Sequence, residues 1–167
     1  MVVTHRERRR IMETNMQDFP HHYTVTAQGG TVGDVELSTG QLSALRSATP
    51  LEFDGPGNRW SPETLLVAAI GDCLMLTFRG IARASNVSWS SLQCDVTGTL
   101  DRVAGVTQFT AFEVHAHLQI AADTSVDRAR SALNKAERTC LIANSLKGAM
   151  HFAATIDVVP EVVAAHA

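Results

Sequence analysis

Strong net charge and long apolar runs are both missing from this sequence. Its 167 residues include 14 Lys and Arg against 17 Asp and Glu, for a formal net charge of −3. This balance gives no general electrostatic case for binding nucleic acid. The longest uncharged apolar run, residues 65–71, is far shorter than the ~18 residues needed to span a bilayer. We therefore expect neither a nucleic-acid partner nor insertion in a membrane.

Cysteine is also scarce, and the start of the chain lacks a secretory pattern. Residues 1–10 carry four arginines, and no apolar segment follows them. The chain has three cysteines, an odd number, and 45% of its residues are hydrophobic. Such a composition argues against a secreted scaffold held by disulfides and for a reducing compartment. The sequence therefore predicts a cytoplasmic protein.

By composition, the chain divides into three parts. Residues 1–20 are polar and Arg-rich without periodicity, which predicts a flexible leader; a basic arm for an acidic partner is the weaker alternative. Residues 21–160 are predicted to form one globular domain, long enough to bury a core. Residues 161–167 are predicted to be a tail.

Within the domain, hydrophobic residues recur with the spacing of a strand in some segments and with that of a helix in others. Alternation with period two predicts strands at 23–27, 35–38, 89–101, 109–120 and 150–159. Helices are predicted at 62–84 and 126–138, and a short one from near Cys140 to Gly148. Thr124 and Asp127 have capping-box spacing for the helix at 126–138. Because strands and helices come in runs rather than in strict alternation, the fold class is α+β.

The segment from Trp60 to Arg83 is the one around which the chain is organised. Ser61 can cap the helix, Pro62 suits its first position, and Glu63 places negative charge at the positive end of the helix dipole. The helix that follows is apolar on nearly every side, which predicts that it is buried.

Three cysteines and two histidines are the other candidates for chemistry. Cys73 lies within the central helix, where a buried packing role is the simplest interpretation. Cys94 lies on the apolar face of a predicted strand and is assigned to the core. His115 and His117 share one strand face, but two imidazoles without a third ligand indicate a solvated surface rather than a metal site.

The motifs together resemble the OsmC/Ohr family, the osmotically inducible and organic-hydroperoxide-resistance proteins. Ser61-Pro62-Glu63 opens the central helix, Ala68-Ala69 and Cys73 lie within it, and Cys140 with Asn144-Ser145-Leu146-Lys147 follows near the C-terminus. The resemblance covers roughly residues 23–159. It implies an OsmC-like intertwined homodimer with antiparallel sheets around a long buried central helix and two active sites at the subunit interface.

The same resemblance implies the roles of individual residues. Cys73 matches the peroxidatic cysteine, Cys140 the resolving cysteine, and Glu63 the active-site glutamate. The family usually has proline directly after the second cysteine, where this chain has Leu141. The arginine that the family pairs with its glutamate is missing from both usual positions, which hold Thr31 and the pair Leu51-Glu52.

Two arginines remain as candidates for the missing cation. Arg59 lies four residues before Glu63 and is the first candidate; Arg46 is the second. An exposed loop charge is an equally good interpretation of Arg59. A positive charge near Cys73 would lower the pKa of its thiol, because the thiolate is the nucleophile.

Helix geometry supports a dimer independently, provided that Glu63 and Cys73 share a site. The two residues are ten positions apart on one helix, which corresponds to about 15 Å along its axis, and they point about 80° apart. Glu63 therefore cannot reach Cys73 of its own chain and must reach that of a second subunit.

The predicted activity is thiol-dependent reduction of organic hydroperoxides. The Cys73 thiolate would attack the O–O bond, and Cys140, expected to be acidified by a helix N-terminus, would condense with the resulting sulfenic acid. A dithiol reductant, for example a lipoyl protein, would restore both thiols, and no metal or organic cofactor is required. Apolar walls favour a bulky organic peroxide over hydrogen peroxide: Leu66, Ile70, Met75 and Phe78. The alternatives are a redox sensor and a dimeric binder of hydrophobic ligands in which the cysteines only pack.

Overall fold

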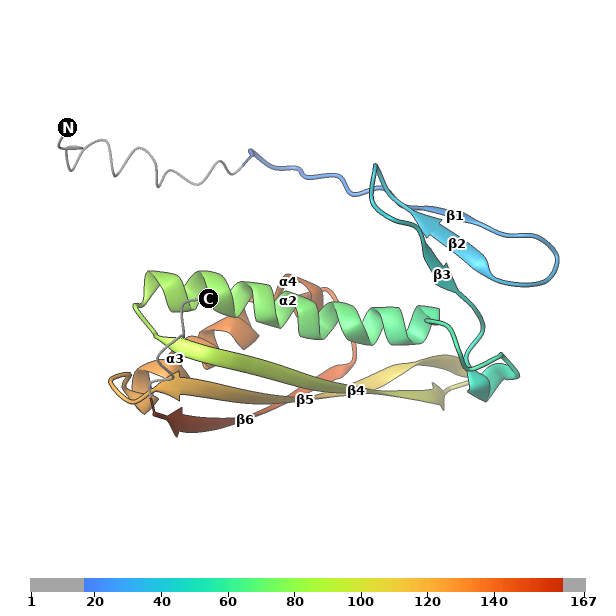
Figure 1. The fold of residues 1–167 in the computed structure, drawn as a ribbon. Coiled ribbons are helices and arrows are strands. Elements are labelled where there is room, and N and C mark those ends of the chain that lie inside the picture. The colour runs from blue at the N-terminus through green and yellow to red at the C-terminus, as the bar shows by residue number, and fades with distance from the viewer. Residues whose placement is uncertain (1–16, 161–167) are drawn as a thin grey trace, which may run out of the picture. The chain divides into compact units, whose positions relative to one another are not determined.

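The computed structural model describes residues 17–160, which form two compact units (Figure 1). The first unit runs through Ser47, and the second begins at Ala48. The predicted Arg-rich leader lies almost wholly outside the described residues, as does the predicted tail from residue 161 onward. The candidate catalytic residues, Arg46 apart, all belong to the second unit.

The first unit contains a small antiparallel sheet. Its strands are β1 (Thr26–Gln28), β2 (Val35–Ser38) and β3 (Leu45–Ser47), in the order β1-β2-β3. The predicted strand at 35–38 is confirmed. The strand predicted at 23–27 overlaps β1 only at Thr26 and Ala27. β3 lies in the segment 41–53, whose pattern is unclear apart from a short extended piece suggested by Leu45 and residues 48–50.

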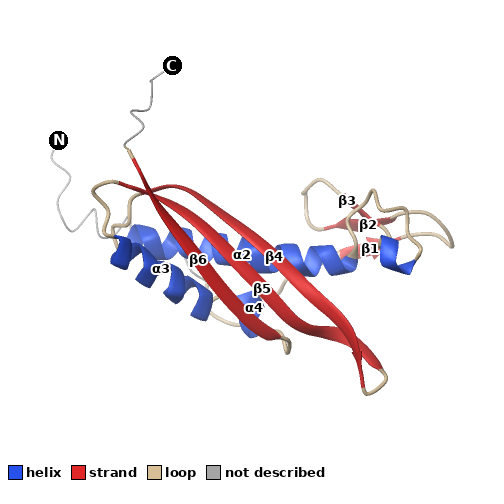
Figure 2. Cartoon of the chain, turned by 90° about the horizontal axis from the view of Figure 1, so that it is seen from below, coloured by secondary structure: helices blue, strands red, loops and turns tan. Residues whose placement is uncertain are grey.

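The second unit pairs one sheet with three helices. A short 3-10 helix, η1 (Leu51–Phe53), precedes the long α2 (Pro62–Ala84), which has the bounds that the sequence predicts. The strands β4 (Trp89–Val103), β5 (Val106–Ala121) and β6 (Ala149–Val159) form the sheet in that order. Between β5 and β6 come α3 (Val126–Arg138) and α4 (Leu141–Asn144), and the helices lie on one face of the sheet (Figure 2). The α+β class is confirmed.

The prediction of purely antiparallel sheets is wrong at one strand pair. β4 and β5 form a long antiparallel hairpin, but β5 and β6 pair in parallel, from Ala111 opposite Ala149 to Ala121 opposite Val159. A parallel pair needs a crossover rather than a tight turn. The α3–α4 segment supplies that crossover, and it carries Cys140 back across the helical face of the sheet.

Helices α2 and α3 each start with a capping side chain. Ser61 accepts from the Thr64 backbone N–H at 3.2 Å, and the Thr64 hydroxyl accepts from the Ser61 N–H at 2.8 Å. At α3 the cap is Ser125, which accepts from the Arg128 N–H, so the predicted capping role of Thr124 is wrong. The Thr124 hydroxyl donates to the Ser88 carbonyl instead, joining α3 to the start of β4.

The core lies between the sheet and helices α2 and α3. Alternate residues of β5 point into it, which is the pattern that the sequence predicts for a sheet with one solvated face. The largest fully buried side chains are Phe78, Phe112, Ile70, Leu118, Ile120 and Leu133. Phe78 packs edge-on against Trp89 at 5.4 Å between ring centroids, fixing the C-terminal half of α2 on β4.

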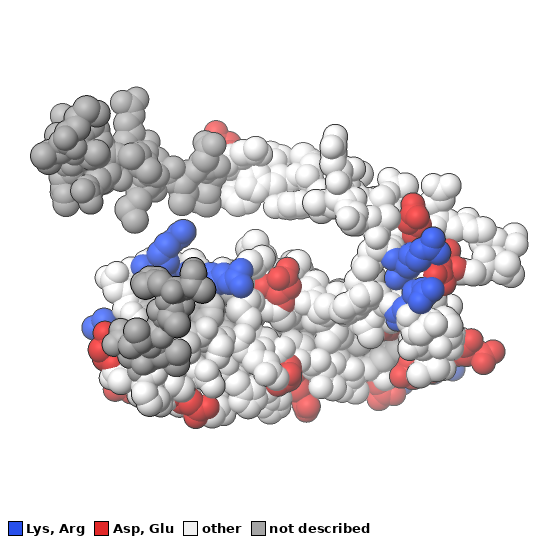
Figure 3. All heavy atoms as spheres, in the orientation of Figure 1, with Lys and Arg blue, Asp and Glu red and all other residues white. Residues whose placement is uncertain are grey.

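Helix α2 is buried on one side only, so the prediction that it is buried all round does not hold within one chain. Its buried residues, Ile70, Leu74, Phe78 and Ala82, recur every four positions and form a single stripe. Leu76, on another side, is 53% exposed. Charged side chains are few on the face that carries α2, and acidic ones gather along the lower edge of the view (Figure 3). One chain therefore leaves an apolar helix face uncovered.

By length and composition alone, α2 is long and apolar enough to cross a membrane. A search for an uninterrupted apolar run does not detect this property of α2, because Asp72 and Arg79 interrupt the run. The core helix of a globular fold passes the same test, and α2 packs here against the sheet and α3.

Gly55 permits the tight loop that leads into α2. A Cβ atom at this position would overlap the Thr49 carbonyl and come within 2.8 Å of the Pro50 oxygen, which accepts from the Gly55 N–H at 2.9 Å. We expect Gly55→Ala to lower the free energy of unfolding by about 1–3 kcal/mol, because backbone cannot move aside as a side chain can. Chemical denaturation measures this change.

Gly80→Ala is the matched control, because beyond its neighbours in the helix no heavy atom of the described residues lies within 4 Å of a Cβ built there. Alanine also favours a helix by about 1 kcal/mol over glycine. Equal stability of the two variants would contradict this account of the loop.

Candidate active site

The structure brings Cys73 and Cys140 together. Cys73 is on α2, and Cys140 is the residue that precedes and caps α4, which packs against α2. The two thiols are hydrogen-bonded to each other, and neither forms a disulfide bond. Cys140 is only 2% exposed, whereas Cys73 is half-buried. Two sulfurs far apart in the sequence therefore lie within contact, with Cys73 the more accessible one.

Neighbouring donors lower the pKa of the Cys73 thiol. Burial by itself raises this pKa, but hydrogen bonds from the Ile142 backbone N–H, the Cys140 thiol, the Thr77 hydroxyl and the Leu141 backbone N–H together outweigh it. The Thr77 hydroxyl oxygen lies 4.0 Å from the Cys73 sulfur, one helical turn further along α2. The thiolate form of Cys73 is consequently favoured over that of an ordinary cysteine.

The prediction that Cys140 is also acidified is wrong. Burial is the largest cause and raises the pKa of Cys140 to about 11. A hydrogen bond from the Ala143 N–H opposes it, the hydrogen bond to Cys73 and the charge of that thiolate add to it, and a weaker bond from the Ile142 N–H opposes it. Because Cys140 donates to Cys73, only one of the two sulfurs can ionise readily. When Cys73 ionises, Cys140 therefore keeps its own proton.

Glu63 lies at a different place on α2 from Cys73. It lines a cavity of about 770 Å³ between the start of α2, the 48–60 loop and β4, and Cys73 is not among the lining residues. Its Oε2 atom is buried without a hydrogen-bond partner among the described residues. The apolar lining includes Phe53, Trp60, Val67, Met75, Val96 and Phe109. This separation agrees with the expectation that Glu63 does not serve Cys73 of its own chain.

Of the apolar walls predicted for the site, Met75 alone lines this cavity. Ile70 and Phe78 are 1% and 0% exposed and belong to the core. Leu66 is partly buried against the same core. The exposed large apolar side chains that lie near the two thiols in sequence are instead Leu76 and Leu141, at 53% and 75%. The sequence predicts a short helix after Cys140 but not where that helix packs.

The two candidate arginines lie in separate units. Arg59 is in the loop before α2, where its Nη1 atom donates to the Asn58 carbonyl at 3.0 Å. Arg46 is on β3 and pairs with Asp34 at 3.6 Å. Burial and neutral hydrogen-bond donors are the main influences on the pKa of the Cys73 thiol, and no arginine of the described residues is among those influences.

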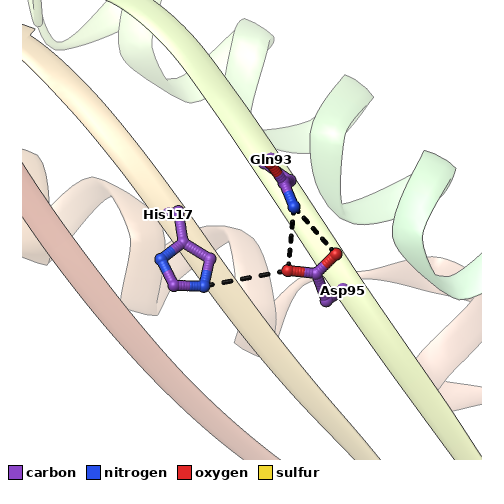
Figure 4. Close-up of polar contacts among 3 residues, drawn as sticks. All are labelled: Gln93, Asp95 and His117. Carbon is purple, nitrogen blue, oxygen red and sulfur yellow. Dashed lines mark hydrogen bonds and ion pairs between the residues drawn. The ribbon is translucent and has the colours of Figure 1, made fainter.

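The remaining candidates have packing or surface positions. Cys94 is on the helix-facing side of β4, where burial and then the charge of Asp95 raise its pKa to about 11. On the opposite, solvated face of the sheet, Asp95 accepts from Gln93 and lies 3.7 Å from His117 (Figure 4). Among the described residues, no group of three or more His, Cys, Asp or Glu side chains could hold a metal ion.

A half-buried thiol of lowered pKa beside a second, protonated thiol defines the class of site found in dithiol redox proteins. The OsmC-like protein family matches residues 55–155, more than half of the chain, and the chain belongs to that family.

Individual relatives are distant but cover most of the chain. It is similar to YmaD, an uncharacterized protein of Bacillus subtilis (strain 168), with 27% identity over 77% of this chain and 88% of that protein. An OsmC-like protein of unknown function from Vibrio cholerae has a similar fold, with a TM-score of 0.74 and 17% identity over 81% of this chain and all of that one. So does an organic hydroperoxide resistance protein OsmC from Legionella pneumophila, with a TM-score of 0.65 and 24% identity over 84% of this chain and all of that one.

Proposed function

We propose that the protein is a thiol-dependent peroxidase that reduces organic hydroperoxides. The observation that supports this most directly is the contact between Cys73, whose pKa is lowered, and the protonated Cys140. The OsmC-like family includes thiol peroxidases. Leu76 and Leu141, near the two thiols in sequence, expose apolar surface, which favours an organic substituent on the substrate over hydrogen peroxide.

The proposed reaction has three steps. The Cys73 thiolate attacks the outer oxygen of ROOH, the O–O bond breaks, and the alkoxide takes a proton to leave as the alcohol ROH, which leaves Cys73 as a sulfenic acid. The Cys140 thiol then attacks that sulfur, forming the Cys73–Cys140 disulfide and releasing water. A dithiol such as a dihydrolipoyl group reduces the disulfide and becomes a disulfide itself.

A second subunit would complete the site. OsmC-like proteins are typically dimeric, and one chain leaves an apolar face of α2 uncovered. In the proposed intertwined dimer, Glu63 of one subunit lies by Cys73 of the other, and Arg59 is the candidate cation that accompanies it. A pairing partner for the buried Glu63 Oε2 would then come from the second subunit, since a buried carboxylate without one is costly.

A redox sensor is the second candidate, favoured by the raised pKa of Cys140. A thiol that stays protonated attacks slowly, which would lengthen the lifetime of the sulfenic acid. Both candidates use a reducing compartment such as the cytoplasm, in keeping with three free thiols.

Peptide mass mapping after one equivalent of cumene hydroperoxide tests the proposal. We expect a Cys73–Cys140 disulfide, with Cys94 still alkylatable, and continuous peroxide consumption when a dithiol is added. A disulfide without continuous consumption would favour the sensor. Absence of the disulfide would rule out both and leave a binder of hydrophobic ligands.

A further inference from the structure

The cavity beside Glu63 has acidic side chains in its lining but no basic ones. Its carboxylates belong to Glu52, Glu63 and Asp72, and no Lys or Arg of the described residues lines it. The Glu63 Oε2 atom is buried without a hydrogen-bond partner in the described part of the chain. Arg59 is exposed in the adjoining loop and is not among the lining residues. Because a buried carboxylate is costly unless it is paired, this cavity requires a positive group from elsewhere.

The uncovered face of α2 changes its charge along the helix. Four exposed residues recur every three or four positions and so form one stripe: Asp72, Leu76, Arg79 and Arg83. Basic side chains lie toward the C-terminal end of α2, and an acidic one lies nearer its middle (Figure 3). A second copy that packs on this face with its helix reversed therefore brings guanidinium groups toward the acidic half of the first.

Symmetry fixes the orientation of the two helices in the proposed dimer. In a two-fold dimer, if Glu63 of one subunit lies by Cys73 of the other, the reverse contact forms as well. Parallel helices cannot make both contacts, because one needs a shift of ten residues forward and the other a shift of ten residues back. Antiparallel helices make both when they cross midway, at residue 68, where the small side chains of Ala68 and Ala69 allow close approach. The shared site therefore requires antiparallel α2 helices.

This arrangement brings Arg79 of the second subunit toward the cavity. Arg79 follows Cys73 by six residues, which places it about 9 Å along the axis from the level of Glu63. Side chains on a helix lean toward its N-terminus, so in an antiparallel pair the Arg79 and Glu63 side chains lean toward each other. Arg83 is one turn further away. Of the two exposed arginines on the stripe, Arg79 is therefore the one placed to meet Glu63.

We propose that Arg79 of the second subunit enters the cavity and pairs with the Glu63 carboxylate. Each site of the dimer then takes Glu63 from one subunit and Cys73 with Arg79 from the other. This inference rests on the part of the proposed function that places Glu63 beside Cys73 of a second subunit. Arg79 is a positioning residue, because it acts by holding the carboxylate. Its planar guanidinium matches a carboxylate with two parallel hydrogen bonds, which a buried pair needs.

Subunit exchange between isotope-labelled and unlabelled full-length protein tests this pair without any peroxide. Native mass spectrometry follows the appearance of mixed dimers for Arg79→Met, Glu63→Gln and the double variant. We expect each single variant to exchange at least about tenfold faster, because removing one member of a buried charge pair mainly speeds dissociation. The double variant should exchange no faster than the faster single variant, because both changes remove the same interaction.

Two further variants serve as controls. Arg79→Lys keeps the charge and should exchange more slowly than Arg79→Met. Arg83→Met removes the neighbouring exposed charge and should stay within about twofold of the unaltered protein. Circular dichroism establishes that each variant is folded, and the comparison of Arg79→Lys with Arg83→Met keeps the test decisive if Arg79→Met is not.

The outcomes separate this inference from the proposed function. If the effects of Arg79→Met and Glu63→Gln multiply in the double variant, or if the unaltered protein is a monomer, the pairing is overturned. Faster exchange by Arg83→Met than by Arg79→Lys would overturn it as well. If the pair is coupled but the unaltered protein consumes no peroxide, the pairing holds and the peroxidase proposal fails.

Discussion

Replacing Cys73 with serine is expected to reduce hydroperoxide consumption to the background seen without protein. Serine has a similar shape, but its hydroxyl does not ionise near neutral pH, so no nucleophile remains to attack the O–O bond. Consumption of cumene hydroperoxide in the presence of dithiothreitol measures the loss. Ser131→Ala, on the exposed side of α3, is a control that should retain full activity.

Cys140→Ser should give a different defect from Cys73→Ser. The first step still proceeds, so each subunit should consume one equivalent of peroxide rapidly and stop with a sulfenic acid on Cys73. Dimedone labelling of Cys73 detects that product. These measurements are made without any added thiol, because a dithiol would itself reduce the sulfenic acid. A Cys140→Ser protein that consumes one equivalent but gives no dimedone adduct would contradict the assignment of Cys140 as the resolving thiol.

Mixing two inactive variants is expected to restore activity if the site is shared between subunits. Cys73→Ser lacks the nucleophile, and Glu63→Gln lacks the carboxylate, so neither homodimer should turn over efficiently. In a heterodimer, one of the two sites combines an intact Cys73 with an intact Glu63 from the other subunit. An equal mixture after subunit exchange should therefore regain about a quarter of the unaltered activity, since half of the dimers are mixed.

The controls for this complementation are direct. The double variant Cys73→Ser and Glu63→Gln, mixed with unaltered protein, should give no gain beyond the unaltered sites that remain. Analytical ultracentrifugation establishes that the mixture is dimeric. No recovery from a dimeric mixture would show that Glu63 does not act on the thiol of a second subunit.

Local patterns were enough to predict α2 from end to end. Ser61 and Pro62 mark its start by groups that act within one turn, so no tertiary contact is needed to place it. The alternation of hydrophobic and polar residues predicted β4 and β5 equally well, because one face of the sheet is buried and the other is solvated. The family was identified from motifs on α2 and around Cys140.

Features that depend on long-range contacts could not be predicted in the same way. The parallel pairing of β6 depends on the path of the crossover, and the pKa of Cys140 depends on how deeply α4 is packed. The helix-terminus rule pointed to acidification of Cys140, but burial outweighs it. Thr77 could have been found from its spacing, four residues after Cys73 on a predicted helix, had its hydroxyl been considered.

The crossover between β5 and β6 has a mechanical consequence for the oxidised protein. A covalent bond between Cys73 and Cys140 would join α2 to the segment between the two parallel strands and close a loop that spans most of the second unit. A loop of that length restricts the unfolded chain enough to stabilise a domain by about 4 kcal/mol. Oxidation would then cross-link the centre of the fold, and the unfolding temperature of the protein would report the redox state of the two thiols.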